Sequence, residues 1–135
     1  MKCFAATERV GLGSGELQVN IEGREIVQRT FLMPDYVMYA MRVQPLNLPL
    51  KRNYEDFSRL RDTLAKLFPG TKLAHLERGS WFSSTNVEFV RRQKVMISFF
   101  LNDLILNQEI RNSRILEDFL TLSDHKKIKR KFEEW

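Results

Sequence analysis

The chain has few of the residues that build covalent or metal-based scaffolds. Its 135 residues include a single cysteine, Cys3, and two histidines, His75 and His125. One cysteine excludes an intramolecular disulfide framework, and no ligand spacing of the zinc type can be assembled. No Asn-x-Ser/Thr glycosylation acceptor occurs. These absences favour a reducing, cytoplasmic environment and a protein that requires neither metal nor cofactor.

Long apolar runs are also missing. No stretch approaches the roughly 18 residues of a membrane span, and residues 1–10 do not have the pattern of a secretory signal. The chain is 43% hydrophobic and 29% charged. Both values are ordinary for a globular protein, so they predict one folded domain and argue against intrinsic disorder.

The charge is positive, with 22 basic against 17 acidic residues and a net charge of +5. A basic balance suggests an anionic partner, either a phospholipid surface or nucleic acid. Basic residues gather in 51–94 and again in 126–131. The aromatic residues fall mostly at core-facing positions and are not interleaved with arginine. This pattern argues against nucleic acid.

The first half of the chain has the patterns of strands. Polar and apolar residues alternate over 16–22, Gly23-Arg24 can form a turn, and 25–32 is a less regular strand. Residues 36–43 are rich in aromatic and β-branched side chains, and 50–54 is the end of an edge strand behind two prolines. The prediction is a small antiparallel meander.

The second half has helical patterns. We expect a helix over 55–68, a loop over 71–84, a long helix over about 86–106 with a capping box at Thr85-x-x-Glu88, a short helix from about Ser113, and a last helix over 126–135. Strands followed by separate helices predict an α+β fold, in which a three-stranded antiparallel β-meander packs against three to four helices.

No catalytic constellation is visible. The two histidines lie in unrelated segments, and the glycines at 11, 13 and 15 precede a strand instead of joining a strand to a helix, so they do not form a phosphate loop. The adjacent acids Glu55 and Asp56 fit the first turn of a helix, where the dipole favours negative charge. We therefore expect a protein that is not an enzyme.

The most informative segment is Lys51-Arg52-Asn53-Tyr54-Glu55-Asp56-Phe57, which continues into a helix that closes with Phe68-Pro69. It resembles the signature of PX (phox homology) domains, Arg-Arg-Tyr-x-Asp-Phe-x-x-Leu. Ile97-x-x-Phe100-Leu101 and Phe119-Leu120 match the long helix and the closing Phe-Leu of the same family. The resemblance covers roughly residues 10–124 and includes the predicted architecture.

The resemblance implies docking on phosphoinositides at endosomal membranes. In such a pocket arginines grip phosphate through charge-assisted hydrogen bonds, and an aromatic ring stacks on the inositol. Two positions depart from the pattern, because Asn53 and Gln93 occupy the places of the two pocket arginines. Tyr54 keeps the ring-stacking position, and a partly buried core tyrosine is an equally good interpretation. Arg52 and Arg92 are neighbouring candidates.

Neither neighbour replaces the missing charge in a simple way. Adjacent strand residues point to opposite faces, so Arg52 cannot substitute for Asn53 unless the strand is bulged. Arg92 is rotated by about 100° from Gln93 around the helix.

The loop before the long helix also departs from the pattern because it lacks the expected prolines. Arg78 is the nearest candidate for a phosphate-binding lysine of the family. Trp81 and Phe82 follow it as candidates for membrane insertion. Packing of these two aromatics against the helices is an equally good interpretation.

The sequence therefore predicts three parts: an N-terminal extension (1–9), a PX-like domain (10–124), and a basic helix (125–135) that begins a linker to a further domain. The expected function is that of a non-catalytic, sorting-nexin-like module that is peripheral on endosomal or vesicle membranes and binds phosphoinositide weakly or atypically. Partners would be anionic membrane and a protein, and oligomerisation would occur beyond Trp135. The alternative is a PX-fold protein-interaction module that does not bind phosphoinositide.

Overall fold

The computed structural model describes residues 17–27, 36–76, 86–123 and 125–134. Within them, three antiparallel strands form one sheet in the order β1-β2-β3, followed by helices. The strands are β1 (Gln18–Val27), β2 (Tyr36–Gln44) and β3 (Leu48–Asn53). The expected α+β meander is confirmed.

The first strand differs from the prediction. Gly23 and Arg24 do not form a turn, because β1 runs through them as one strand of 10 residues. The pairing register with β2 shifts between Ile21 and Gly23, so the irregularity is absorbed as a bulge. Of the predicted second strand, the first residues belong to β1, and 28–32 lie outside the described residues.

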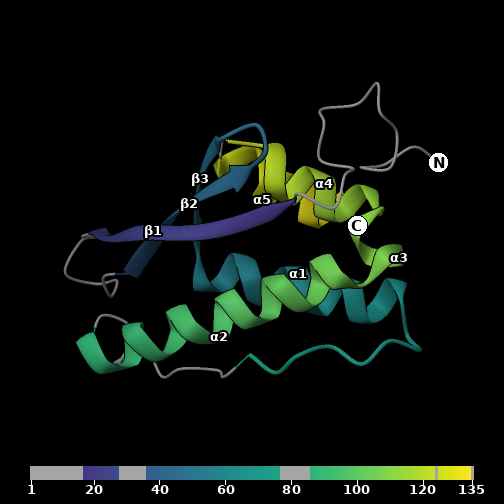
Figure 1. The fold of residues 1–135 in the computed structure, drawn as a ribbon, viewed down its shortest axis with the longest axis horizontal. Helices are drawn as coiled ribbons and strands as arrows, with labels where there is room; N and C mark the ends of the chain where they lie inside the picture. The colour runs from purple at the N-terminus through teal and green to yellow at the C-terminus, as the bar shows by residue number, and fades with distance from the viewer. Residues whose placement is uncertain (1–16, 28–35, 77–85, 124, 135) are drawn as a thin grey trace.

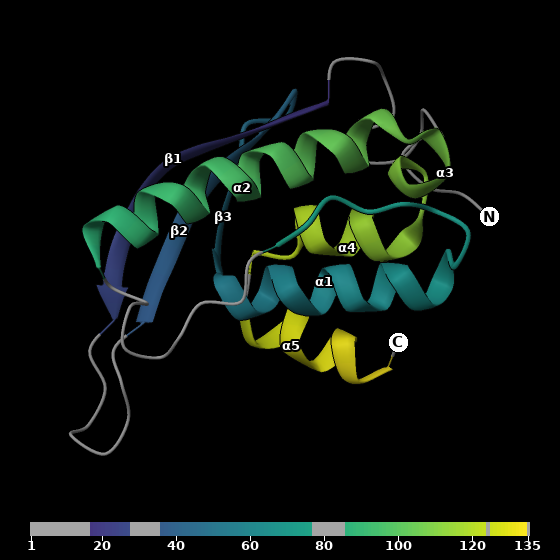
Figure 2. The same cartoon turned by 90° about the horizontal axis from the view of Figure 1, so that it is seen from below.

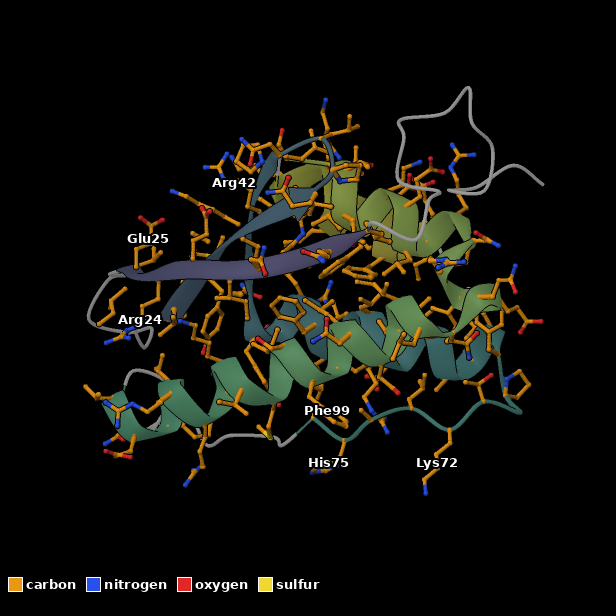
Figure 3. The ribbon with its side chains drawn as sticks, in the orientation of Figure 1. Arg24, Glu25, Arg42, Lys72, His75 and Phe99 are labelled. Carbon is orange, nitrogen blue, oxygen red and sulfur yellow. The ribbon has the colours of Figure 1, made fainter. Side chains whose placement is uncertain are left out.

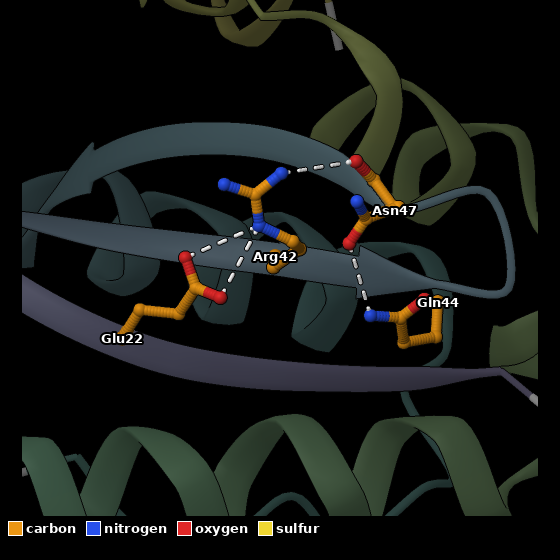
Figure 4. A network of polar contacts seen from close by, with 4 residues as sticks. All are labelled: Glu22, Arg42, Gln44 and Asn47. Atoms are coloured by element: carbon orange, nitrogen blue, oxygen red, sulfur yellow. Dashed lines mark hydrogen bonds and ion pairs between the residues drawn. The ribbon is translucent and has the colours of Figure 1, made fainter.

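A short turn joins β2 to β3 and is tied to the outer face of the sheet (Figure 4). Asn47 has a φ of 58° in this turn, a left-handed conformation that asparagine tolerates. Gln44 Nε2 donates to Asn47 Oδ1 at 3.2 Å, and Arg42 Nη1 donates to the Asn47 carbonyl at 3.3 Å. Arg42 Nε also donates to both carboxylate oxygens of Glu22 at 3.2 Å, which links this face to β1.

The first two helices form where they are predicted. Helix α1 (Tyr54–Leu67) buries Phe57, Leu60 and Leu64, but Leu67 is 44% exposed although its spacing predicts an inward position. The last turn of α1 extends past the core. Helix α2 (Val87–Leu106) buries every member of the inner stripe that the helical spacing predicts, namely Phe89, Gln93, Ile97, Phe100, Leu101, Leu104 and Ile105. Its N-cap is Asn86 and not Thr85 of the predicted capping box, and the Asn86 side chain accepts a hydrogen bond from the Phe89 amide at 3.1 Å.

Three helices follow α2. Helix α3 (Gln108–Arg111) is a single turn that the sequence pattern does not predict, whereas α4 (Arg114–Thr121) begins about where a short helix is predicted, with Ser113 as its N-cap. Helix α5 (His125–Glu134) contacts α1. Its Ile128 side chain is fully buried, and the Phe132 ring lies 6.1 Å from that of Phe119.

The sheet lies over α1 and α2, whereas α4 and α5 appear beside it (Figure 1). In the view from below, α4 appears between α2 and α1, and α5 lies on the far side of α1 (Figure 2). One core joins the inner face of the sheet to α1, α2 and α4. Consequently β3, α1 and α2, which carry the candidate site residues, all face the same interior.

Candidate functional site

Arg52 points into the protein. It pairs with Tyr39 in the regular β2–β3 register, so it lies on the inner face of the sheet, and its side chain is fully buried. Nη2 donates to the Phe119 carbonyl at 2.8 Å and to the Leu122 carbonyl, and Nη1 donates to the Lys51 carbonyl at 2.8 Å. The guanidinium lies over the Phe119 ring, 5.1 Å from its centroid.

These contacts make Arg52 the C-terminal cap of α4. The last carbonyls of a helix lack partners within it and carry a partial negative charge, so a cation there is favourable. Burial lowers the pKa of Arg52 to about 10, and the buried Asp56 carboxylate opposes this shift. A pKa of about 10 keeps the guanidinium charged at neutral pH. Its charge is directed inward, where a ligand at the surface does not reach it.

Asn53 begins helix α1. Its side chain Oδ1 accepts a hydrogen bond from the Asp56 amide at 2.9 Å, and Asp56 Oδ2 accepts one from the Asn53 amide at 2.9 Å. This reciprocal pair is a capping box, so the polar end of Asn53 is engaged within the chain. Tyr54, the next residue, is partly buried and packs against the hydrophobic core.

Gln93 is buried between α2 and the sheet. Its Oε1 accepts a hydrogen bond of 2.6 Å from the Tyr39 hydroxyl, and the two side chains are 3% and 0% exposed. Burial, followed by proximity to Tyr54, raises the pKa of Tyr39 well above its usual value, which keeps the hydroxyl protonated as the donor. The sequence predicts Gln93 on the inner face of the helix but gives no sign of its partner, which is 54 residues away.

Arg24 is a basic residue that the sequence analysis does not select. It pairs with Tyr39 in the β1–β2 register and acts electrostatically on that tyrosine. Figure 3 shows Arg24 on the side of the sheet that faces α2, while Glu25 points the other way. Once β1 is recognised as a single strand, the alternation of its side chains around the bulge explains this orientation.

The first half of α2, which carries three basic residues, lies at the same end of the molecule as the end of β1 (Figure 1). Arg91, Arg92 and Lys94 are all solvent-exposed. Arg91 pairs with Glu88 at 3.5 Å, and the Arg92 guanidinium lies 5.8 Å from the centroid of the Phe89 ring. With Arg24 these side chains form what we call the basic end of the protein.

The outer face of the sheet is more nearly balanced in charge. Arg42 pairs with Glu22 and Lys51 with Glu25, each at 3.2 Å. Among the described residues, basic side chains outnumber acidic ones at the basic end and on helix α5. The exposed basic residues of α5 are Lys126, Lys127, Lys129 and Arg130.

The remaining predicted site residues cannot be placed. Arg78, Trp81 and Phe82 lie outside the described residues. A cleft of about 230 Å³ does occur, but at the other end of α2, between residues 71–73 and the start of α3. In the part of the chain that the structure describes, no three His, Cys, Asp or Glu side chains could jointly hold a metal, and no helix could span a membrane.

Curated sequences similar to this chain are sorting nexins. Sorting nexin-16 of Mus musculus is 31% identical over 105 residues, and that of Homo sapiens is 30% identical over the same length. Each alignment covers 77% of this chain and 30% of the relative. The chain therefore spans less than a third of the curated proteins it matches.

Solved structures show the same fold. A designed CISK-PX domain aligns with a TM-score of 0.63 at 20% identity, covering 76% of this chain and 97% of that one. The solution structure of the Vam7p PX domain aligns with a TM-score of 0.58 at 21% identity, covering 82% and 97%. The family model of the PX domain matches residues 44–123. With more than half of its length matched by that model, the chain belongs to the PX domain family.

Proposed function

We propose that this chain is a non-catalytic membrane-docking module of a sorting-nexin-like protein in endosomal or vesicle trafficking, and that it binds phosphoinositide head groups weakly or atypically. The observation that carries the proposal is the engagement of the two neutral pocket positions. Asn53 caps α1, and Gln93 accepts the hydrogen bond of a buried tyrosine. Neither position offers a positive charge.

The loss of charge can be put in numbers. A hydrogen bond to a charged group contributes about 1.5–3 kcal/mol, so two missing arginines remove about 3–6 kcal/mol of head-group binding. This is a factor of roughly a hundred or more in affinity. Arg52 does not compensate, because its guanidinium is buried against the end of α4.

The basic end supports contact with an anionic membrane through diffuse electrostatics. Arg24, Arg91, Arg92 and Lys94 are exposed there, and two apolar side chains nearby, Ile26 and Val87, are 52% and 53% exposed. Basic residues near an anionic bilayer contribute about 1 kcal/mol each, and exposed apolar residues add interfacial partitioning. The expected attachment is peripheral and sensitive to salt.

The same neutral positions favour a second candidate function, a PX-fold module that binds a protein and not a lipid. A peptide would be received beside α2 or along an edge strand of the sheet. In this case the parent protein would reach its membrane through a partner.

A vesicle sedimentation series separates these functions. The probes are neutral phosphatidylcholine vesicles, vesicles with added phosphatidylserine, and vesicles in which phosphatidylinositol 3-phosphate replaces phosphatidylserine at equal total negative charge. Binding that follows total charge and disappears in high salt supports diffuse docking. Strong preference for the phosphoinositide at equal charge contradicts the proposal of weak head-group binding. No binding to any vesicle supports the protein-interaction module.

Substitutions locate the surface. Arg24→Ala together with Arg92→Ala should weaken charge-dependent binding, whereas Lys51→Ala, on the balanced outer face of the sheet, should leave it unchanged.

Asn53→Arg should raise the affinity for phosphatidylinositol 3-phosphate above that for phosphatidylserine if the missing charge alone disables the pocket. An unchanged affinity in a folded Asn53→Arg protein would show that the shape of the pocket is altered as well.

A further inference from the structure

Helix α5 packs against the protein by a narrow apolar side. Ile128 is fully buried, and the Phe132 ring lies 6.1 Å from that of Phe119. At about 100° per residue, Lys126 and Arg130 fall on the side of the helix opposite Ile128, and both are exposed. We call the outer face of α5 the surface formed by its exposed basic residues, Lys126, Lys127, Lys129 and Arg130.

The outer face of α5 keeps most of its positive charge unneutralised. Within the part of the chain that the structure describes, no ion pair joins Lys127, Lys129 or Arg130 to a carboxylate. Basic side chains of the sheet and of α1 are instead paired with glutamates at 3.1–3.2 Å. A cluster of cations on one exposed face attracts anions.

The order of charges along α5 is the reverse of the order that stabilises a helix. Lys126 and Lys127 stand near its start, and Glu133 and Glu134 stand at its end. The helix dipole favours acids at the start and bases at the end, and only Lys131, which pairs with Glu134 at 3.9 Å, follows that rule in the last turn. The charge pattern does not serve the helix itself, which agrees with a role in binding.

The shape of this surface favours a membrane as its partner. The outer side of a single packed helix is convex, whereas peptides bind in grooves or along sheet edges. Long basic side chains on a convex face fit a flat anionic bilayer, where each contributes by charge without a dedicated pocket. The apolar residues of α5 face the core, so the helix would dock on the bilayer surface without inserting.

The outer face of α5 and the basic end belong to opposite sides of the molecule. In Figure 2, α2 lies along one edge and α5 along the other, with α1 between them. Because Ile128 points toward α1, the outer face of α5 points away from α1 and α2. A flat bilayer held by the basic end therefore leaves the outer face of α5 free for another anionic surface.

We propose that the outer face of α5 is a second docking surface for anionic membrane, so that one molecule bridges two bilayers. The inference rests on the proposed function, because the basic end holds the first bilayer. It adds a surface and a consequence, the clustering of vesicles, that docking through the basic end does not produce.

The test compares clustering with binding, using phosphatidylcholine vesicles that contain phosphatidylserine. Turbidity and dynamic light scattering report clustering, and sedimentation reports binding. The parent chain should cluster these vesicles at low salt, and high salt should disperse them. Lys127→Glu with Arg130→Glu should slow clustering by roughly tenfold or more, while the protein still sediments with the vesicles through the basic end.

A matched control carries the same change in net charge elsewhere. Lys51→Glu with Lys72→Glu alters two exposed lysines, one on the outer face of the sheet and one beside the cleft at the far end of α2. This variant should keep most of the clustering. Equal losses in the two variants, with circular dichroism showing folded proteins, would mean that net charge and not the outer face of α5 decides, and would overturn the proposal.

The remaining outcomes separate the inference from the proposed function. A parent chain that sediments with vesicles but never clusters them overturns the bridge and leaves docking through the basic end intact. If the α5 variant no longer sediments while Arg24→Ala with Arg92→Ala sediments like the parent, α5 is the docking surface and both assignments fail. If the parent ignores vesicles but binds soluble polyglutamate through α5, the partner is an acidic protein segment, which also overturns the proposal.

Discussion

The guanidinium of Arg52 lies over the ring of Phe119 and donates a hydrogen bond to the carbonyl of the same residue at 2.8 Å. A residue from the third strand thus holds the end of a helix 67 positions later in the chain. The PX signature in this protein contributes an internal clamp at Arg52 and a helix cap at Asn53.

The clamp predicts a large difference between two neighbouring residues. Arg52→Met keeps most of the length but removes the charge, and it leaves the buried Phe119 carbonyl and the partly buried Leu122 carbonyl without their donor. We expect the free energy of unfolding to fall by about 3 kcal/mol. Lys51→Met, which breaks only the exposed pair with Glu25, should change it by less than about 1 kcal/mol. Urea denaturation measures both, and equal losses would contradict the clamp.

The cap at Asn53 predicts a graded series. Asn53→Ala removes the acceptor for the Asp56 amide and should lower stability by about 1 kcal/mol, whereas Asn53→Ser keeps an acceptor and should stay near the parent. Asn53→Arg should lower stability by a similar amount, although it adds a positive charge. Thermal or urea unfolding checks the order. An Asn53→Ala protein as stable as the parent would show that the capping box is not important.

The buried bond between Tyr39 and Gln93 should behave as a coupled pair. Gln93→Leu leaves the Tyr39 hydroxyl buried without a partner and should destabilise the fold by about 1–3 kcal/mol. Adding Tyr39→Phe should return part of that loss, because the unpaired hydroxyl is removed. A double-mutant cycle from urea denaturation gives the coupling, and strictly additive effects would show that the two side chains do not share a bond.

The raised pKa of Tyr39 gives a prediction in alkaline solution. The folded state holds the phenol protonated, so its contribution to stability is fully present below the pKa of the unfolded chain, about 10, and declines as pH rises beyond that value. Alkaline unfolding should therefore coincide with tyrosinate formation at Tyr39. Absorbance in the tyrosinate band should rise as the protein unfolds, and the Tyr39→Phe protein should lack the part of this rise that comes from Tyr39. Ionisation of Tyr39 while circular dichroism is still native would contradict the assignment.

Local periodicity was sufficient to predict most of the helices. The inner stripe of α2, including its polar member Gln93, follows from spacing alone, and the start of α4 near Ser113 is predicted as well. The Gly23-Arg24 pair misleads because a glycine followed by a polar residue is typical of both a turn and a bulge. Which one forms depends on pairing with β2, which is a property of the sheet and not of the segment.

The roles of the site residues were less predictable. Strand alternation indicates that Arg52 and Asn53 point to opposite faces, but the acceptors of Arg52 come from the end of α4. The partner of Gln93 comes from β2 in the same way. Such contacts join segments far apart in sequence, and no local pattern encodes which distant groups will meet.

The position of the Arg52 acceptors has a consequence for how the chain matures on the ribosome. Translation delivers the strand carrying this arginine well before the carbonyls of Phe119 and Leu122, which are 67 and 70 residues further on. At about 5–20 residues per second, several seconds pass before those acceptors exist. During this interval the guanidinium lacks its two acceptors at the end of α4 and is best left hydrated. The nascent polypeptide is therefore expected to delay final compaction until the segment with Phe119 and Leu122 has emerged.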